Sequence, residues 1–312
     1  MELGFILLTI LGLTLFEVIT SIDNAVINAE VLSTMGKRAR RFFLVWGILF
    51  AVFIVRGLLP LLVVFATNPS LGIIGALTAT FSGDPHVQEA IEASSPILLI
   101  GGGVFMVFLF FNWLFIEPKN YGLRGEKFLH EQGAWFFAIV SILLSVIVWF
   151  ALDRNPIMAF AAVIGSTAFF IVHGFRNYAE QQEKKLLSGK MSDVSKIAYL
   201  EALDSTFSID GVIGAFAFTF AVPLILLGNG LGAIVLRQLT VSNIERIKKY
   251  RYLKNGAMYS ILFLGTIMIL DSFGYHIPAY ISPIITFGTV GYFFYKSRIE
   301  IRDIEAILEP KA

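Results

Sequence analysis

Long apolar segments dominate this sequence and leave too little polar surface for a water-soluble domain. Hydrophobic residues make up 56% and charged residues 15% of its 312 residues, and the mean hydropathy is +0.76. Such a composition is typical of a polytopic membrane protein. We therefore expect an all-α bundle of about nine spans, forming one transmembrane domain over residues 1–312. The spans are predicted at residues 3–33, 42–66, 97–116, 134–152, 157–175, 197–221, 222–243, 256–273 and 278–296.

Basic residues are sorted between alternate loops of this predicted bundle. One set of loops holds 21 of the 24 Lys and Arg residues, the opposite set holds only Arg154, and Arg56 and Arg237 lie inside spans. Because cytoplasmic loops collect Lys and Arg, this distribution predicts an N-terminus outside and a C-terminus in the cytoplasm. Residues 1–20 lack the basic segment of a cleavable signal peptide, so we expect the first span to be retained.

Two acidic segments, EVITSIDNAVIN at 17–28 and DSTFSIDGVIGA at 204–215, align without a gap. A carboxylate inside a membrane span is costly and is usually functional. The two segments lie five predicted spans apart, and an odd offset reverses the direction of the second copy across the membrane. The alignment pairs Glu17 with Asp204, Ser21 with Ser208, Asp23 with Asp210 and Asn24 with Gly211.

The reversed copies predict an inverted repeat, a plan typical of secondary transporters with a substrate site near the membrane midplane. Spans one to three, about residues 1–116, form the first repeat, and spans six to eight, about 197–273, form the second. Spans at 134–175 connect them, and the span at 278–296 is an addition. Arg56 and Arg237 occupy equivalent places in the spans that follow the two acidic segments.

One polar stripe follows the first span. On a regular helix Ser21, Asn24 and Asn28 fall within about 40° of Glu17, whereas Asp23 lies about 120° from it. Asp23 therefore faces another helix, or the helix is distorted between residues 21 and 24. In the second copy, Gly211 and Gly214 favour a local break of the helix. The sequence does not choose between a distorted helix and an Asp23 that faces another helix.

The side chains of the two segments supply oxygen ligands for a hard divalent cation such as Mn²⁺, Mg²⁺ or Ca²⁺. The chain has no cysteine, which excludes thiolate metal sites and disulfides. The predicted metal ligands are Glu17, Asp23, Asn24, Asn28, Asp204 and Asp210, supported by Ser21, Ser208 and Glu201, with Arg56 and Arg237 as counter-charges. The alternative for the serines and asparagines is hydrogen bonding between helices without a ligand, and for Glu201 it is a position at the membrane surface.

An empty cluster of like charges does not remain fully ionised, so proton coupling is a further hypothesis. We expect the lipid bilayer and a bound divalent cation as partners, and neither nucleic acid, a resident cofactor nor an enzymatic activity. An inverted repeat is compatible with both export and import.

The segments FEVITSIDNAVINAEVL at 16–32 and LEALDSTFSIDGVIGAFAFT at 200–219 resemble the TerC superfamily, in particular its DUF475 branch. The runs RRFFLVWGILFAVFIVRGLLP at 40–60 and VLRQLTV at 235–241 are similar too. The resemblance implies a multi-pass protein of the bacterial cytoplasmic membrane, manganese export and a link to tellurium resistance. It also implies that Glu17, Asp23, Asn24, Asp204 and Asp210 are metal-site residues. Where the family pattern has a Glu-His pair and a further His, this chain has Lys254, Asn255 and Met258.

Two other functions compete with transport. Asp23 and Asp210 on two helices resemble the dyad of an intramembrane aspartyl protease, although the chain lacks its Gly-x-Gly-Asp sequence. A non-transporting membrane component of a metal or oxyanion stress complex would tolerate loss of the carboxylates while needing its cytoplasmic loops.

Overall fold

The computed structural model describes residues 3–47, 85–187, 192–242 and 247–308 and a few isolated positions between 48 and 84. The described residues form eleven α-helices and one short π-helix, without strands, so the predicted all-α class is confirmed for this part of the chain. The elements are α1 (Leu3–Thr20), α2 (Ile22–Ser33), α3 (Lys37–Phe42), η1 (Phe43–Gly47), α6 (Pro85–Phe115), α7 (Glu126–Glu131), α8 (Trp135–Leu152), α9 (Pro156–Leu187), α10 (Asp193–Ala215), α11 (Val222–Ser242), α13 (Leu253–Ser272) and α14 (Ile281–Leu308).

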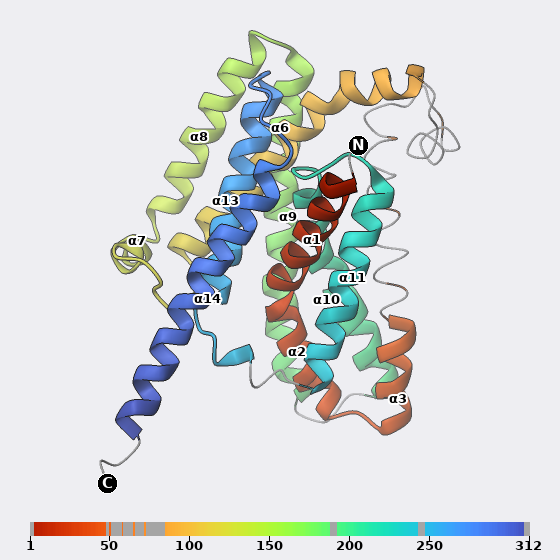
Figure 1. The fold of residues 1–312 in the computed structure, drawn as a ribbon, viewed down its shortest axis with the longest axis vertical. Helices are drawn as coiled ribbons and strands as arrows, with labels where there is room; N and C mark the ends of the chain where they lie inside the picture. The colour runs from red at the N-terminus through yellow and green to blue at the C-terminus, as the bar shows by residue number, and fades with distance from the viewer. Residues whose placement is uncertain are drawn as a thin grey trace.

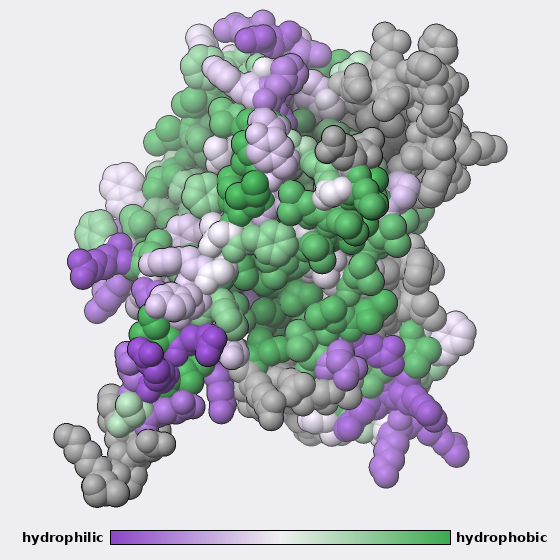
Figure 2. All heavy atoms as spheres, in the orientation of Figure 1, coloured by the Kyte–Doolittle hydropathy of each residue, from purple (hydrophilic) through white to green (hydrophobic). Residues whose placement is uncertain are grey.

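Six helical segments of the described chain are long and apolar enough to cross a membrane: Leu3–Thr20, Ala93–Phe115, Trp135–Leu152, Pro156–Tyr178, Val222–Thr240 and Leu253–Ser272. A broad apolar band covers the middle of the face seen in Figure 2, and polar side chains gather toward its two ends. The predicted spans at 197–221 and 278–296 correspond to α10 and α14, which are helical but more polar. Most of the predicted span at 42–66 lies outside the described residues.

Several predicted span ends are wrong, among them that at 296, since α14 continues to Leu308, and that at 221, since α10 ends at Ala215. The segment at 67–96, predicted as an outer loop or a short surface helix, is helical from Pro85, where α6 begins. The segment at 176–196, predicted as a linker or a short surface helix, is mostly helical, since α9 continues to Leu187 and α10 begins at Asp193. In both places polar residues extend an apolar helix beyond its hydrophobic segment, and hydropathy alone does not detect such extensions.

The first predicted span is two helices rather than one. Ser21 separates α1 from α2 with φ −99° and ψ 6°, while hydrogen bonds from Ser21 N to Glu17 O and from Ala25 N to Ser21 O keep the chain nearly helical. The helix is therefore distorted at Ser21, which is one of the two alternatives that the sequence left open. The break predicted in the second copy is wrong, because α10 runs unbroken through Gly211 and Gly214.

The helix α6 lies at the centre of the bundle, where it packs on α9 and α13 (Figure 1). Glycines allow these contacts: a Cβ atom on Gly103 would lie 2.8 Å from the carbonyl oxygen of Gly265, and one on Gly101 would lie 2.9 Å from that of Ala161. Phe105 and Phe108 pack edge-on against Phe169 of α9. The helices α1, α2, α10 and α11 gather beside this core.

The contact between α6 and α9 provides a test of this packing. A Cβ atom on Gly165 would collide with the backbone of Gly101, so Gly165→Ala should destabilise the protein by about 1–3 kcal/mol through overpacking. Gly174 lies on the same helix with open space around it, so Gly174→Ala should leave stability unchanged or raise it by up to about 1 kcal/mol. Thermal unfolding in detergent measures both, and equal melting temperatures for the two variants would contradict this packing.

Candidate functional site

The polar stripe of the first acidic segment faces α10. Glu17, Ser21, Asn24 and Asn28 are all buried, with 0%, 3%, 4% and 8% of their surface exposed. The predicted common face of these four residues is therefore confirmed. It continues across the break at Ser21, so that Glu17 belongs to α1 and the two asparagines to α2.

Glu17 occupies space that two glycines leave open. The Ser21 hydroxyl donates to Glu17 Oε1 at 2.8 Å. A Cβ atom on Gly211 of α10 would lie 2.8 Å from Glu17 Oε2, and one on Gly232 of α11 would lie 2.6 Å from Glu17 Cβ. The absence of side chains at these two positions lets the carboxylate reach the interface of three helices.

Asp204 of α10 accepts hydrogen bonds from two amides of α2. The Nδ2 atoms of Asn24 and Asn28 both donate to Asp204 Oδ1, the latter at 2.9 Å. The Oδ1 atoms of Asn24 and Asn28 are buried and have no hydrogen-bond partner in the described part of the chain. Ser208 donates to the main-chain oxygen of Asp204 rather than to its carboxylate, so any support from Ser208 is to the helix backbone.

Asp210 forms a buried ion pair with Arg176 of α9. The Nη2 atom of Arg176 lies 2.6 Å from Asp210 Oδ2, and both residues are 7% exposed. The pair is lined by Phe105, Leu109, Phe169 and Val172 and by the imidazole of His173. The predicted place of Arg176 in a cytoplasmic loop is wrong, because α9 extends past it to Leu187.

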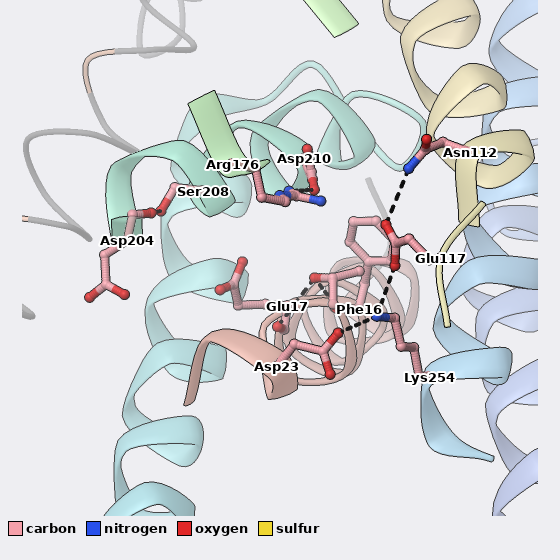
Figure 3. A network of polar contacts seen from close by, with 11 residues as sticks. Phe16, Glu17, Asp23, Asn112, Glu117, Arg176, Asp204, Ser208, Asp210 and Lys254 are labelled. Carbon is pink, nitrogen blue, oxygen red and sulfur yellow. Dashed lines mark hydrogen bonds and ion pairs between the residues drawn. The ribbon is translucent and has the colours of Figure 1, made fainter. Parts of the chain in front are cut away.

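Asp23 points away from this stripe toward α13, as Figure 3 shows. The Lys254 ammonium lies 2.7 Å from Asp23 Oδ2 and 3.0 Å from Glu117 Oε2, and so it joins α2 to the segment that follows α6. Asn112 of α6, fully buried, donates to the other oxygen of Glu117. Burial opposes the charge of Glu117, but Lys254 outweighs it and holds the pKa of this carboxyl below its usual range.

The four motif carboxylates do not form one cage in this structure. Among the described residues no three His, Cys, Asp or Glu side chains lie close enough to hold a metal ion together. Instead Glu17 and Asp204 lie along the interface of α1 and α2 with α10, Asp210 contacts Arg176, and Asp23 contacts Lys254. The assignment of these carboxylates as metal ligands remains a prediction.

The remaining predicted residues lie at the edge of this arrangement. Glu201 of α10 is half-buried, and its carboxylate packs against Gly47. Arg237 of α11 is half-buried and has no ion pair with any residue that the structure describes, and Arg56 lies outside the described residues. Within the described part of the chain, ion pairs with motif carboxylates are given for Arg176 and Lys254.

Three charged residues of the polar network, and one buried asparagine outside it, were not predicted as site residues. Arg176 and Lys254 had been counted as loop residues, and Glu117 lies just beyond the end of a predicted span. Asn229 of α11 is fully buried, and neither polar atom of its side chain has a partner in the described chain. Its flanking sequence GNG, within an apolar span, was the only local signal for it.

Comparisons with known proteins agree with a membrane location. The family model described as "Protein of unknown function (DUF475)" matches residues 22–303. A protein of Rickettsia felis named "Uncharacterized membrane protein" is 28% identical over 109 residues, which cover 33% of this chain and 36% of that protein. The match thus spans little more than a third of the relative's length. No solved structure matches the chain at a significant level.

The buried ion pair of Arg176 and Asp210 predicts that substitutions of the two residues have non-additive effects on stability. Asp210→Asn leaves a buried guanidinium without its counter-charge and should cost about 3–5 kcal/mol of stability. Adding Arg176→Met to Asp210→Asn should recover part of that loss. Thermal unfolding of wild type, the two single variants and the double variant completes a double-mutant cycle. Additive losses of stability would show that the two side chains do not interact.

The lowered pKa of Glu117 predicts a dependence of stability on pH. A carboxyl whose pKa is lower in the folded state stabilises the protein above its usual pKa of 4.5, and this contribution is lost as the pH falls through the folded value. The melting temperature of wild type should therefore fall more steeply below about pH 4.5 than that of Glu117→Gln. Parallel curves for the two proteins would contradict the ion pair with Lys254.

Proposed function

Because the chain belongs to the DUF475 family, and because its carboxylates are buried between helices, we propose that it is a secondary transporter of a divalent cation. Mn²⁺ is the first substrate to test. The resemblance noted in the sequence favours export across a bacterial cytoplasmic membrane, with the N-terminus outside and the C-terminus in the cytoplasm. The multi-pass membrane protein that the apolar helices and the relative indicate is consistent with this role.

One observation carries the proposal: oxygen-bearing side chains from both acidic segments are buried against each other. Glu17, Asn24 and Asn28 on one side and Asp204 on the other place carboxylate and amide oxygens at a single helix interface. Hard divalent cations prefer these ligands. The buried Oδ1 atoms of Asn24 and Asn28 have no partner among the described residues, so they are available to a cation.

The contacts between the segments also support the inverted repeat. Glu17 of the first segment packs on Gly211 of the second, and Asp204 of the second accepts a hydrogen bond from Asn24 of the first. The alignment equates Glu17 with Asp204 and Asn24 with Gly211, so a two-fold rotation converts one contact into the other. A substrate bound on such an axis contacts both repeats, which is the arrangement that alternating access requires.

Two competing functions gain less support. A protease dyad needs two carboxyl groups in contact, whereas Asp23 contacts Lys254 and Asp210 contacts Arg176. A component of a stress complex that does not transport has no evident need for buried carboxylates at a helix interface, because each of them is costly in a membrane.

Mn²⁺ flux in proteoliposomes tests the proposal. Glu17→Gln and Asp204→Asn should each lower the flux at least about tenfold, which corresponds to about 1.4 kcal/mol of lost interaction with the cation. Glu30→Gln is the matched control, since Glu30 lies on α2 in an exposed ion pair with Lys248. Asp23→Asn and Asp210→Asn extend the series to the aspartates held by basic side chains.

Two outcomes would overturn this function. If the wild type transports none of Mn²⁺, Mg²⁺ and Ca²⁺, a divalent cation is not the substrate. If folded Glu17 and Asp204 variants keep full flux, these two residues do not form the transport site. Flux that is independent of pH on both sides of the membrane would remove the proton coupling while leaving the transporter in place.

A further inference from the structure

Lys254 lies between two carboxylates in the position that a bound cation would take. Its Nζ atom is 2.7 Å from Asp23 Oδ2 and 3.0 Å from Glu117 Oε2, distances typical of charge-assisted hydrogen bonds. The two acids come from different elements, α2 and the segment after α6, so the ammonium bridges parts of the chain that no other ion pair of the described residues joins. Figure 3 shows Lys254 between them.

A buried amide orients one of the two acids, and the helix dipole opposes the ammonium that they hold. Asn112 is fully buried behind Glu117 and orients it by donating to Oε1, and Asn112 Oδ1 has no partner among the described residues. Lys254 itself lies in the first turn of α13, where the helix dipole disfavours positive charge. The carboxylates therefore have to stabilise the ammonium against the dipole as well as against its partial burial.

The motif aspartate of the second segment has an analogous partner. Asp23 and Asp210 are aligned, and Lys254 holds the first while Arg176 holds the second. The other aligned pair, Glu17 and Asp204, accepts hydrogen bonds from the Ser21 hydroxyl and the Asn24 amide. Among the contacts given for the described residues, Asp23 and Asp210 therefore pair with basic side chains, and Glu17 and Asp204 accept hydrogen bonds from neutral donors.

We propose that Lys254 is a tethered cation that fills a second cation position, formed by Asp23 and Glu117 and separate from the site of Glu17 and Asp204. The protein's own ammonium neutralises this position, so that no mobile cation is needed there when the chain changes conformation. The effect of this second cation position on transport rests on the proposed function, but the existence of the position does not.

Removing the ammonium should open the position to an added ion. With Mn²⁺ alone as the probe, purified Lys254→Met should bind about one more Mn²⁺ per chain than wild type, because two adjacent carboxylates lose their counter-charge. Electron paramagnetic resonance of free Mn²⁺ measures this stoichiometry. The additional ion should disappear in Lys254→Met with Glu117→Gln, and it should be absent from Lys254→Arg.

Lys248→Met is the matched control. Lys248 also forms an ion pair between elements, with Glu30 at 3.3 Å, but that pair lies at the surface. This variant should bind the same number of ions as wild type. Equal stoichiometry for folded Lys254→Met and wild type would overturn the proposal.

If Lys254→Met folds poorly, melting temperatures test the proposal instead. If uncompensated charge causes the loss, Lys254→Met with Glu117→Gln should melt at a higher temperature than Lys254→Met alone. An equally low melting temperature for both would show that Lys254 acts through packing, and the proposal would fail. The proposed function fails on a different result, the absence of wild-type Mn²⁺ flux. That result does not affect the number of Mn²⁺ ions bound by Lys254→Met relative to wild type.

Discussion

The cost of placing carboxylates inside an apolar helix bundle governs the arrangement of this protein. A charge removed from water has to be paired, hydrogen-bonded or protonated. The bundle meets this requirement in two ways. Arg176 and Lys254 reach Asp210 and Asp23 from α9 and α13, whereas amides of α2 and a hydroxyl reach Asp204 and Glu17. The positions of α9 and α13 around the acidic segments follow from these contacts as much as from apolar packing.

The glycines are the second requirement, because they set how closely the polar groups approach. Gly211 and Gly232 leave room for Glu17, and glycines of α6, α9 and α13 bring the central helices into backbone contact. Small residues at helix interfaces are the usual means of close packing in membranes, where lipid is as apolar as the side chains. In this protein small residues at a helix interface also leave room for the carboxylate of Glu17.

The sequence was sufficient to predict the features that depend on local periodicity. The stripe of Glu17, Ser21, Asn24 and Asn28 follows from helical spacing within one segment, and the same spacing left a distortion near Ser21 as one of two alternatives. Hydropathy could not predict that Arg176 and Lys254 contact the motif aspartates, because basic residues beside apolar segments are usual at cytoplasmic span ends. Their partners are set by the packing of helices remote in sequence, with 34 positions separating Arg176 from Asp210. The conformation of α10 was also wrongly predicted, since glycine permits a break without requiring one.

The break at Ser21 divides the polar stripe between two helices. Glu17 belongs to α1, Asn24 and Asn28 belong to α2, and Asp204 belongs to the unbroken helix α10. A change of backbone angle at this single residue would therefore alter the separation between the carboxylate of Glu17 and the amides of α2 without unwinding either helix. The spacing between these oxygen-bearing side chains thus depends on the conformation of one residue.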